Sequence, residues 1–269
     1  MHIKPKKSLG QNFLIDKNIQ RKICRACDLT HKDVVLEIGA GSGALTVELA
    51  SAVKKVYALE IDQRLFPILD KNLSGFANCQ VIKADILKFD INKFLRENKL
   101  KQKIKVIGNI PYYISSPIIE HLIRYRDNIS TIFITVQKEF GRRVRAVPGS
   151  KDYGSFSCFV QYYLEPEIIF EIKKNSFHPA PKVDSCFLAL RKREKPAVAV
   201  KDEEIFFKLI RAAFNQRRKT LRNSLKGFIA PDSLEEFFNA QGIDKNVRPE
   251  DLSLEQFACL AEIKGDGSL

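Results

Sequence analysis

The chain has 269 residues, of which 45% are hydrophobic and 29% charged, a composition typical of folded domains with enough apolar material for a core. Its 45 Lys and Arg residues outnumber its 32 Asp and Glu residues, and the resulting net charge of +13 indicates an acidic partner, most often nucleic acid or an anionic membrane surface. No apolar run approaches the roughly 20 residues of a membrane helix, the first residues lack a signal-peptide pattern, and six cysteines are too few for a disulfide scaffold. We therefore expect a soluble protein of the reducing cytoplasm with no membrane partner.

Cys24 and Cys27 have the C-x-x-C spacing of some zinc and redox sites. No second pair of this kind follows, and neither does a pair of histidines with metal-ligand spacing. We interpret the two cysteines as small residues on one helix turn and expect no metal site.

The first part of the chain alternates strand-like and helical patterns. Helical spacing over residues 44–52 and 64–73 separates short apolar runs. Such runs occur at residues 34–38, 56–60, 81–82, 104–107 and 131–136. This alternation predicts βαβ units, a mostly parallel sheet and helices on both of its faces. Residues 168–172 and 186–190 are expected to add an antiparallel hairpin at the sheet edge.

The pattern changes after residue 190. Residues 191–196 are charged and end in proline, which indicates a linker. Helical spacing of apolar residues then predicts three helices, from residue 202, from residue 231 and around residues 254–260. We expect an α/β domain over residues 1–190 and a small helical domain over residues 191–269. Residues 208–226 hold seven basic residues and no acidic one, which favours phosphate contact over an ordinary solvated face.

A glycine-rich loop over residues 37–44 follows the first strong strand and opens a helix. Gly39, Gly41 and Ala44 satisfy the G-x-G-x-x-A dinucleotide pattern, so the loop suits NAD as well as S-adenosylmethionine. Glu60 ends the next strand, where a carboxylate accepts from ribose hydroxyls of either cofactor. Asp85 follows the third strand and either caps a helix or accepts from an adenine amine; an acid there favours S-adenosylmethionine.

The tetrad Asn109-Ile110-Pro111-Tyr112 directly follows the fourth strand and is expected to face the same crevice. A tight turn accounts for Asn109 and Pro111 but not for Tyr112-Tyr113. Catalysis at an adenine N6 amine accounts for the whole tetrad. The side-chain oxygen of Asn109 and the carbonyl before Pro111 would accept both amine N–H groups, while the tyrosine ring stacks on the base.

Five segments together resemble the bacterial ribosomal RNA adenine dimethyltransferases. They comprise residues 11–16, 37–43, 109–112, 177–185 and 214–223. The resemblance implies a Rossmann-like class I S-adenosylmethionine-dependent methyltransferase sheet with a small C-terminal helical domain that binds RNA or the ribosome. It further implies N6,N6-dimethylation of two adjacent adenosines near the 3′ end of 16S rRNA, with S-adenosylmethionine as cofactor.

The resemblance also implies roles for single residues. Asn12 and Leu14 would close over the cofactor, and Gly39 and Gly41 would bind it, with Gly39 at its methionine end. Glu60 would bind the ribose of the cofactor, and Asp85 its adenine. Asn109 would bind cofactor and target amine, with Pro111 shaping the tetrad. Tyr112 would stack on one face of the target base and Phe177 on the other.

The implied partner is 16S rRNA within the immature small ribosomal subunit, bound by a monomer. Three basic clusters are candidates for phosphate contact: Lys4, Lys6 and Lys7; Arg142, Arg143 and Arg145; and Arg217, Arg218, Lys219 and Arg222. Three alternatives stay open: a macrolide-resistance enzyme acting on 23S rRNA, a non-catalytic assembly factor of the small subunit, and an NAD-dependent oxidoreductase.

Overall fold

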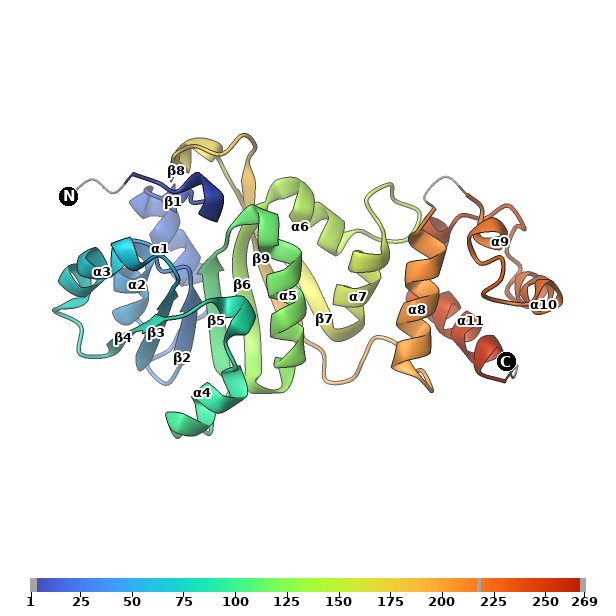
Figure 1. The fold of residues 1–269 in the computed structure, drawn as a ribbon, viewed down its shortest axis with the longest axis horizontal. Coiled ribbons are helices and arrows are strands. Elements are labelled where there is room, and N and C mark those ends of the chain that lie inside the picture. The colour runs from blue at the N-terminus through green and yellow to red at the C-terminus, as the bar shows by residue number, and fades with distance from the viewer. Residues whose placement is uncertain (1–3, 217–218, 267–269) are drawn as a thin grey trace. The chain divides into compact units, whose positions relative to one another are not determined.

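The computed structural model describes residues 4–216 and 219–266, which form two compact units (Figure 1). The first unit runs through residue 141 and includes residues 166–192, whereas the second contains residues 142–165 and the described chain from residue 193 onward. The chain passes from one unit to the other after residues 141, 165 and 192, and the expected boundary at residue 190 lies close to the last of these. Residues 142–165, however, belong to the second unit. Hydrogen bonds from the main-chain N–H groups of Arg193 and Ala197 to the carbonyls of Tyr163 and Tyr162 tie them to the chain that follows.

Within the described residues, seven strands of the chain form one sheet in the order β4-β3-β2-β5-β6-β9-β7. The strands are β2 (Val34–Ile38), β3 (Lys55–Glu60), β4 (Cys79–Lys83), β5 (Ile104–Asn109), β6 (Ile129–Gln137), β7 (Leu164–Ile172) and β9 (Ser185–Lys192). The five strands from β4 to β6 are parallel, as the alternating pattern predicts, and β9 is antiparallel to β6. β9 and β7 are neighbours at one edge. Arg191 and Lys192, expected in a linker, are the last residues of β9.

The strand register brings three chain segments to one edge of the sheet. Ile38 in the interior strand β2 is paired with Leu59 on one side and Gly108 on the other. The residues that follow these three therefore leave the sheet together at its carboxyl edge. In an open α/β sheet this edge is where ligands bind.

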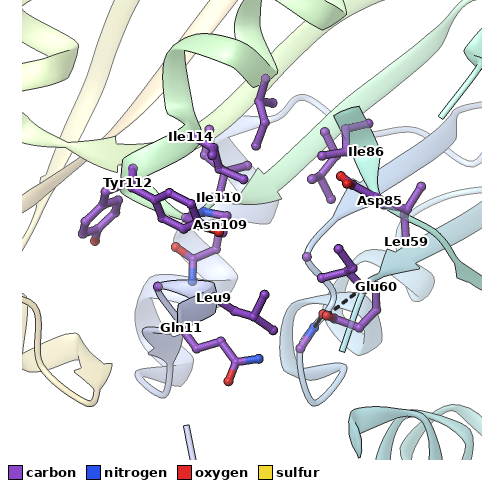
Figure 2. A pocket seen from close by; sticks show the side chains of 18 of the residues that line it. Leu9, Gln11, Leu59, Glu60, Asp85, Ile86, Asn109, Ile110, Tyr112 and Ile114 are labelled. Atoms are coloured by element: carbon purple, nitrogen blue, oxygen red, sulfur yellow. Dashed lines mark hydrogen bonds between the residues drawn. The ribbon is translucent and has the colours of Figure 1, made fainter. Parts of the chain in front are cut away.

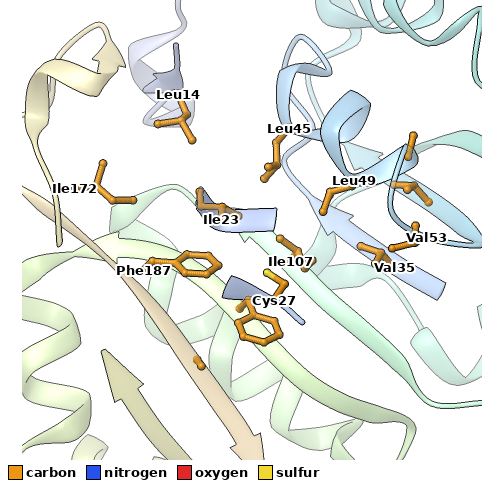
Figure 3. Packing of buried hydrophobic residues seen from close by; sticks show 14 of the residues in the cluster. Leu14, Ile23, Cys27, Val35, Leu45, Leu49, Val53, Ile107, Ile172 and Phe187 are labelled. Atoms are coloured by element: carbon orange, nitrogen blue, oxygen red, sulfur yellow. The ribbon is translucent and has the colours of Figure 1, made fainter. Parts of the chain in front are cut away.

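Helices cover both faces of the sheet in the first unit (Figure 1). They are α1 (Lys17–Ala26), α2 (Ala44–Ala50), α3 (Phe66–Leu73), α4 (Ile91–Glu97) and α5 (Ser115–Arg124). Adjacent residues of β3 point to opposite faces, as strand geometry requires. Val56 belongs to the apolar cluster with α1 and α2, whereas the ring of Tyr57 lies 4.7 Å from that of Phe94 on α4. Figure 3 shows part of the cluster, with Ile23 of α1 and Cys27, the residue that follows this helix, close to Phe187 of the sheet.

A second, two-stranded sheet joins the N-terminal arm to a distant loop. β1 (Phe13–Leu14) pairs antiparallel with β8 (Phe177–His178), so that Leu14 is in register with Phe177. Each strand has only two residues, too few for a periodic pattern, and the pairing was not predicted. Short 3-10 helices complete the connections: η1 (Lys7–Leu9), η2 (Gln63–Leu65), η3 (Ile86–Lys88), η4 (Tyr112–Ile114), η5 (Arg126–Asn128), η6 (Lys174–Ser176) and η7 (Pro249–Asp251).

The second unit is helical. Its elements are the end of α6 (Lys138–Arg145), α7 (Ser155–Tyr163), α8 (Glu203–Phe214), α9 (Leu221–Ser224), α10 (Pro231–Gln241) and α11 (Leu254–Asp266). The three predicted helices correspond to α8, α10 and α11. Phe206 and Phe257 are fully buried in its core, and the hydroxyls of Tyr162 and Tyr163 donate to Glu203 at the start of α8.

The C-x-x-C pair lies at the end of α1. Cys27 is buried in the apolar cluster, and burial raises the pKa of the Cys24 thiol to about 12. Neither thiol is an activated nucleophile, in agreement with the interpretation of the pair as packing residues. No helix in the described ranges is both long and apolar enough to cross a membrane.

Candidate functional site

A pocket in the first unit opens at the carboxyl ends of β2, β3 and β5. Figure 2 shows Glu60 and Asp85 on one side of it and Asn109 and Tyr112 on the other, with Gln11 of the N-terminal arm between them. Eight residues expected at the site line this pocket: Asn12, Gly39, Gly41, Glu60, Asp85, Asn109, Pro111 and Tyr112. Segments that lie far apart in the sequence thus form one crevice. It lies at the carboxyl ends of the parallel strands, which is the position expected from the sequence.

The floor of the pocket is the glycine loop between β2 and α2. Gly39 and Gly41 have φ angles of +73° and +61°, a region that residues with a Cβ rarely adopt. A Cβ on Gly41 would lie 3.2 Å from Cδ1 of Phe13. The two glycines therefore keep the backbone open to a ligand at a place where a side chain would fill the space.

The Glu60 carboxylate connects the glycine loop to the end of β3. It is only 5% exposed, and its Oε2 accepts from the Gly41 N–H at 2.8 Å (Figure 2). Its Oε1 accepts from the N–H groups of Ile61 and Asp62 at 2.9 and 2.8 Å. Burial raises the pKa of Glu60, and the three backbone donors act against that rise. The group is an anchored acceptor, suited to hydroxyl donors such as those of a ribose.

The geometry of Asp85 fits both roles expected of it, that of a helix cap and that of a hydrogen-bond acceptor for a ligand. Its Oδ1 accepts from the Leu87 N–H at 2.9 Å and so caps η3, as a helix N-cap does. The residue also lines the pocket, and its Oδ2 has no hydrogen-bond partner in the described part of the chain. One oxygen thus fixes the side chain while the other can accept from a ligand.

The side-chain amide of Asn109 has a defined orientation. Its Nδ2 donates to the main-chain carbonyl oxygen of Asn12 at 2.8 Å. This contact uses the nitrogen end of the amide and leaves Oδ1 as the group available to accept from a substrate. The side chain of Asn12 donates to the carbonyl of Gly10 at 3.2 Å, which fixes the arm locally.

Tyr112 is held by strand β9, which begins at the same edge of the sheet. Its hydroxyl shares a hydrogen bond of 2.6 Å with Oγ of Ser185, the first residue of β9, which is fully buried. Burial raises the pKa of Tyr112, so the ring stays a neutral phenol at physiological pH. Pro111 precedes it with φ −61° and sets the start of η4.

A polar latch holds the N-terminal arm across the pocket. Nε2 of Gln11 donates to Oδ2 of Asp62 at 2.8 Å, and Oε1 of Gln11 accepts from the Lys6 N–H at 2.7 Å. The Arg64 guanidinium donates to the same aspartate and holds its pKa well below the usual range. No pattern in the sequence indicates this latch, because its two ends lie 51 residues apart and neither belongs to a strand-end pattern.

The side chains of Leu14 and Phe177 do not line the pocket. They are 7% and 2% exposed and pack into the apolar cluster, because the β1–β8 pairing turns both of them inward (Leu14 in Figure 3). Neither side chain therefore makes the contact expected of it in this arrangement. Their roles at the cofactor and the target base remain predictions.

The basic clusters differ in how far their charges are already paired. Lys4 and Lys6 on the arm are exposed, as are Arg142, Arg145 and Lys219. Arg222 forms an ion pair with Glu235, and Lys208 pairs with Glu204 at 2.6 Å. Arg217, Arg218 and the side chain of Lys7 lie outside the described residues. A run of one charge sign in the sequence is thus partly neutralised by acids from outside the run.

These groups fit a nucleoside-bearing methyl donor. Glu60 and Asp85 present acceptors on one side, the glycine loop offers a cradle that a single Cβ would fill, and Asn109 faces them. S-adenosylmethionine supplies a methyl carbon bound to a positively charged sulfur, which needs no activation by the protein. The fold and the site define a class I S-adenosylmethionine-dependent methyltransferase.

Comparison with known proteins specifies the class further. Residues 2–266 match the sequence model of the family described as "Ribosomal RNA adenine dimethylase", and the chain belongs to this family. It is 45% identical to "Ribosomal RNA small subunit methyltransferase A" of Moorella thermoacetica, over 96% of this chain and 91% of the relative.

Two solved structures are similar over nearly their whole length. The 23S rRNA methyltransferase ErmE has a TM-score of 0.74 and 28% identity, covering 95% of this chain and 100% of that one. A dimethyladenosine transferase from Plasmodium falciparum has a TM-score of 0.75 and 26% identity, covering 94% of this chain and 98% of that one. The chain is therefore an enzyme that transfers methyl groups from S-adenosylmethionine to adenine in ribosomal RNA.

Proposed function

We propose that this enzyme dimethylates N6 of two adjacent adenosines near the 3′ end of 16S rRNA, within the immature small ribosomal subunit. It acts as a monomer in the cytoplasm during ribosome assembly. The observation that carries the proposal is the orientation of Asn109, whose amide oxygen is left to accept from a substrate inside the pocket.

The chemistry follows from the weakness of the nucleophile. The lone pair of an adenine N6 amine is delocalised into the ring, so the amine attacks a methyl group poorly. Oδ1 of Asn109 and the main-chain carbonyl of Ile110 would accept its two N–H bonds and favour a localised lone pair. Pro111 restricts the backbone that carries this carbonyl, so little reorganisation is needed. The ring of Tyr112 would stack on the base and keep the amine in line for transfer.

The choice of the small subunit rests on relatedness along the chain. Identity is 45% to a relative named for the small subunit and 28% to ErmE, which acts on 23S rRNA. The target base must leave its stack to enter the pocket, at a cost of a few kcal/mol. Phosphate contacts of the exposed basic residues would offset this cost, and the helical second unit would contribute to them. Affinity for the subunit should therefore fall steeply as salt rises.

Purified small and large subunits from a strain without this modification distinguish the candidates. Each is incubated with the enzyme and labelled methyl donor, and the RNA is digested to nucleosides. The proposal predicts N6,N6-dimethyladenosine from 16S rRNA only, at two neighbouring positions. Label in 23S rRNA would instead assign the macrolide-resistance function. Subunit binding without any methylated adenosine would indicate an assembly factor.

A further inference from the structure

Tyr113 differs from its neighbour Tyr112 in its surroundings. Tyr112 is largely buried and shares a hydrogen bond with Ser185, whereas Tyr113 is 62% exposed and lines the same pocket. Its hydroxyl has no hydrogen-bond partner among the described residues. A large aromatic ring is thus exposed to solvent at the mouth of the pocket, and the proposed methyl transfer to the target adenine does not use it.

The ring of Tyr113 rests on bare backbone of the N-terminal arm. A Cβ added to Gly10 would lie 2.9 Å from its Cδ1 and 3.0 Å from its Cε1. Gly10 has φ +59°, so glycine suits this position both by conformation and by the space that the ring occupies. The arm supports one side of the ring and leaves most of its surface open.

Positive charge lies on the same turn of the arm. The Leu9 N–H donates to the carbonyl of Lys6 at 3.0 Å, which closes the turn just before Gly10, and the side chain of Lys6 is exposed. The exposed ring thus contacts an arm segment that also carries an exposed lysine. Proteins bind single-stranded nucleic acid with this pair of groups, an aromatic ring on which a base stacks and positive charge that attracts the phosphate backbone.

We propose that Tyr113 is a stacking platform for the nucleobase next to the adenine held in the pocket. The inference rests on the proposed function, in which the substrate carries two adjacent adenosines. While one is in the pocket, its neighbour is one backbone step away and has left its own stack. The Tyr113 ring receives that base, so it contributes to the binding of the RNA and not to methyl transfer itself.

The test compares four variants for KM and kcat on undermethylated small subunits and for equilibrium subunit binding. Tyr113→Ala removes the ring and should raise KM and the subunit Kd about tenfold, with kcat and donor affinity unchanged. Tyr113→Phe keeps the ring and should behave as wild type. Tyr113→Leu covers Gly10 without an aromatic face and should resemble Tyr113→Ala. Ile15→Ala is the matched control, since Ile15 is a large exposed apolar residue, 58% exposed, that does not line the pocket.

A subunit Kd of Tyr113→Ala equal to that of wild type would overturn the inference. So would a Tyr113→Leu protein with wild-type binding, because apolar cover of Gly10 would then be the whole role of Tyr113. Failure of the proposed function is a separate outcome, seen when the wild-type protein methylates only 23S rRNA. The same variants assayed on that RNA would then still decide whether Tyr113 binds the neighbouring base.

Discussion

The side-chain Nδ2 of Asn109 donates to the main-chain carbonyl of Asn12 across 97 residues of sequence. The partner is a backbone atom of the N-terminal arm, so no side-chain substitution at Asn12 removes it directly. The contact selects which end of the amide faces the pocket and so makes the arm part of the catalytic arrangement. Whatever holds the arm in place should therefore affect the site.

The Gln11 latch provides a test of this dependence. Gln11→Ala removes a hydrogen bond to an ionised carboxylate, a contact worth about 1.5–3 kcal/mol. We expect donor affinity, measured by calorimetry, to fall about tenfold, because the arm residues that line the pocket lose their tether. Gln102→Ala is the control, since this exposed amide donates to the carbonyl of Lys32 and does not line the pocket. An unchanged donor affinity in Gln11→Ala would show that the latch does not contribute to donor binding.

The bond between Tyr112 and Ser185 predicts a non-additive pair of substitutions. Tyr112→Phe and Ser185→Ala each remove the same hydrogen bond and leave the ring in place. Each should lower kcat a few-fold, the effect of losing one hydrogen bond worth about 1 kcal/mol. The kcat of the double variant should be no lower than that of either single variant. Additive effects in single-turnover methylation would mean that Ser185 does not act through Tyr112.

Glu37 in strand β2 should make folding stability depend on pH. It is fully buried, its Oε2 has no partner among the described residues, and burial raises its pKa from 4.5 to about 8, with Glu60 adding to the rise. A raised pKa favours the folded state while the group is protonated. Its contribution is therefore complete below pH 4.5 and is lost as the pH rises toward 8, at up to about 1.4 kcal/mol per pH unit.

Glu37→Gln keeps the shape of the side chain without its titration. The free energy of unfolding of the variant relative to wild type should rise between pH 5 and pH 8 and then level off, as measured by urea denaturation across that range. A difference that stays constant with pH would contradict the assignment.

Gly141 marks a close approach between α6 and the sheet. A Cβ there would lie 2.3 Å from Sγ of Cys186, so Gly141→Ala should destabilise the protein by about 1–3 kcal/mol and lower its melting temperature. Gly75→Ala is the matched control, because nothing lies within 4 Å of a Cβ at that position. The control should be neutral or slightly stabilising. Equal melting temperatures for the two variants would show that the contact relaxes freely.

The parallel sheet and most of the pocket could be predicted from the sequence. Short apolar runs alternate with helical spacing, and Glu60, Asp85 and Asn109 each stand where a strand ends. The geometry of parallel sheets brings such positions to one edge, so local patterns suffice to group them. Asp85 shows the limit of this reasoning, since a cap and a ligand-binding carboxylate have the same local pattern and the residue has the geometry of both.

Features that depend on contacts between distant segments could not be predicted. The β1–β8 pairing involves two residues on each side and turns Phe177 into the core, whereas the resemblance implies that it stacks on the target base. Residues 142–165 belong to the helical unit because of hydrogen bonds to chain that follows β9. Arg222 lies in a basic run, yet its partner Glu235 is supplied by another helix.

The most direct measurement of the central claim is the methylation state of 16S rRNA in cells that lack their own small-subunit dimethyltransferase. Cells carrying the wild-type chain should contain two adjacent dimethyladenosines. Cells carrying Asn109→Ala should contain almost none, since loss of one oriented acceptor costs about 10²–10³ in rate. Full dimethylation by Asn109→Ala, with the protein present at wild-type level, would contradict the assignment of the amide oxygen as the acceptor of the target amine.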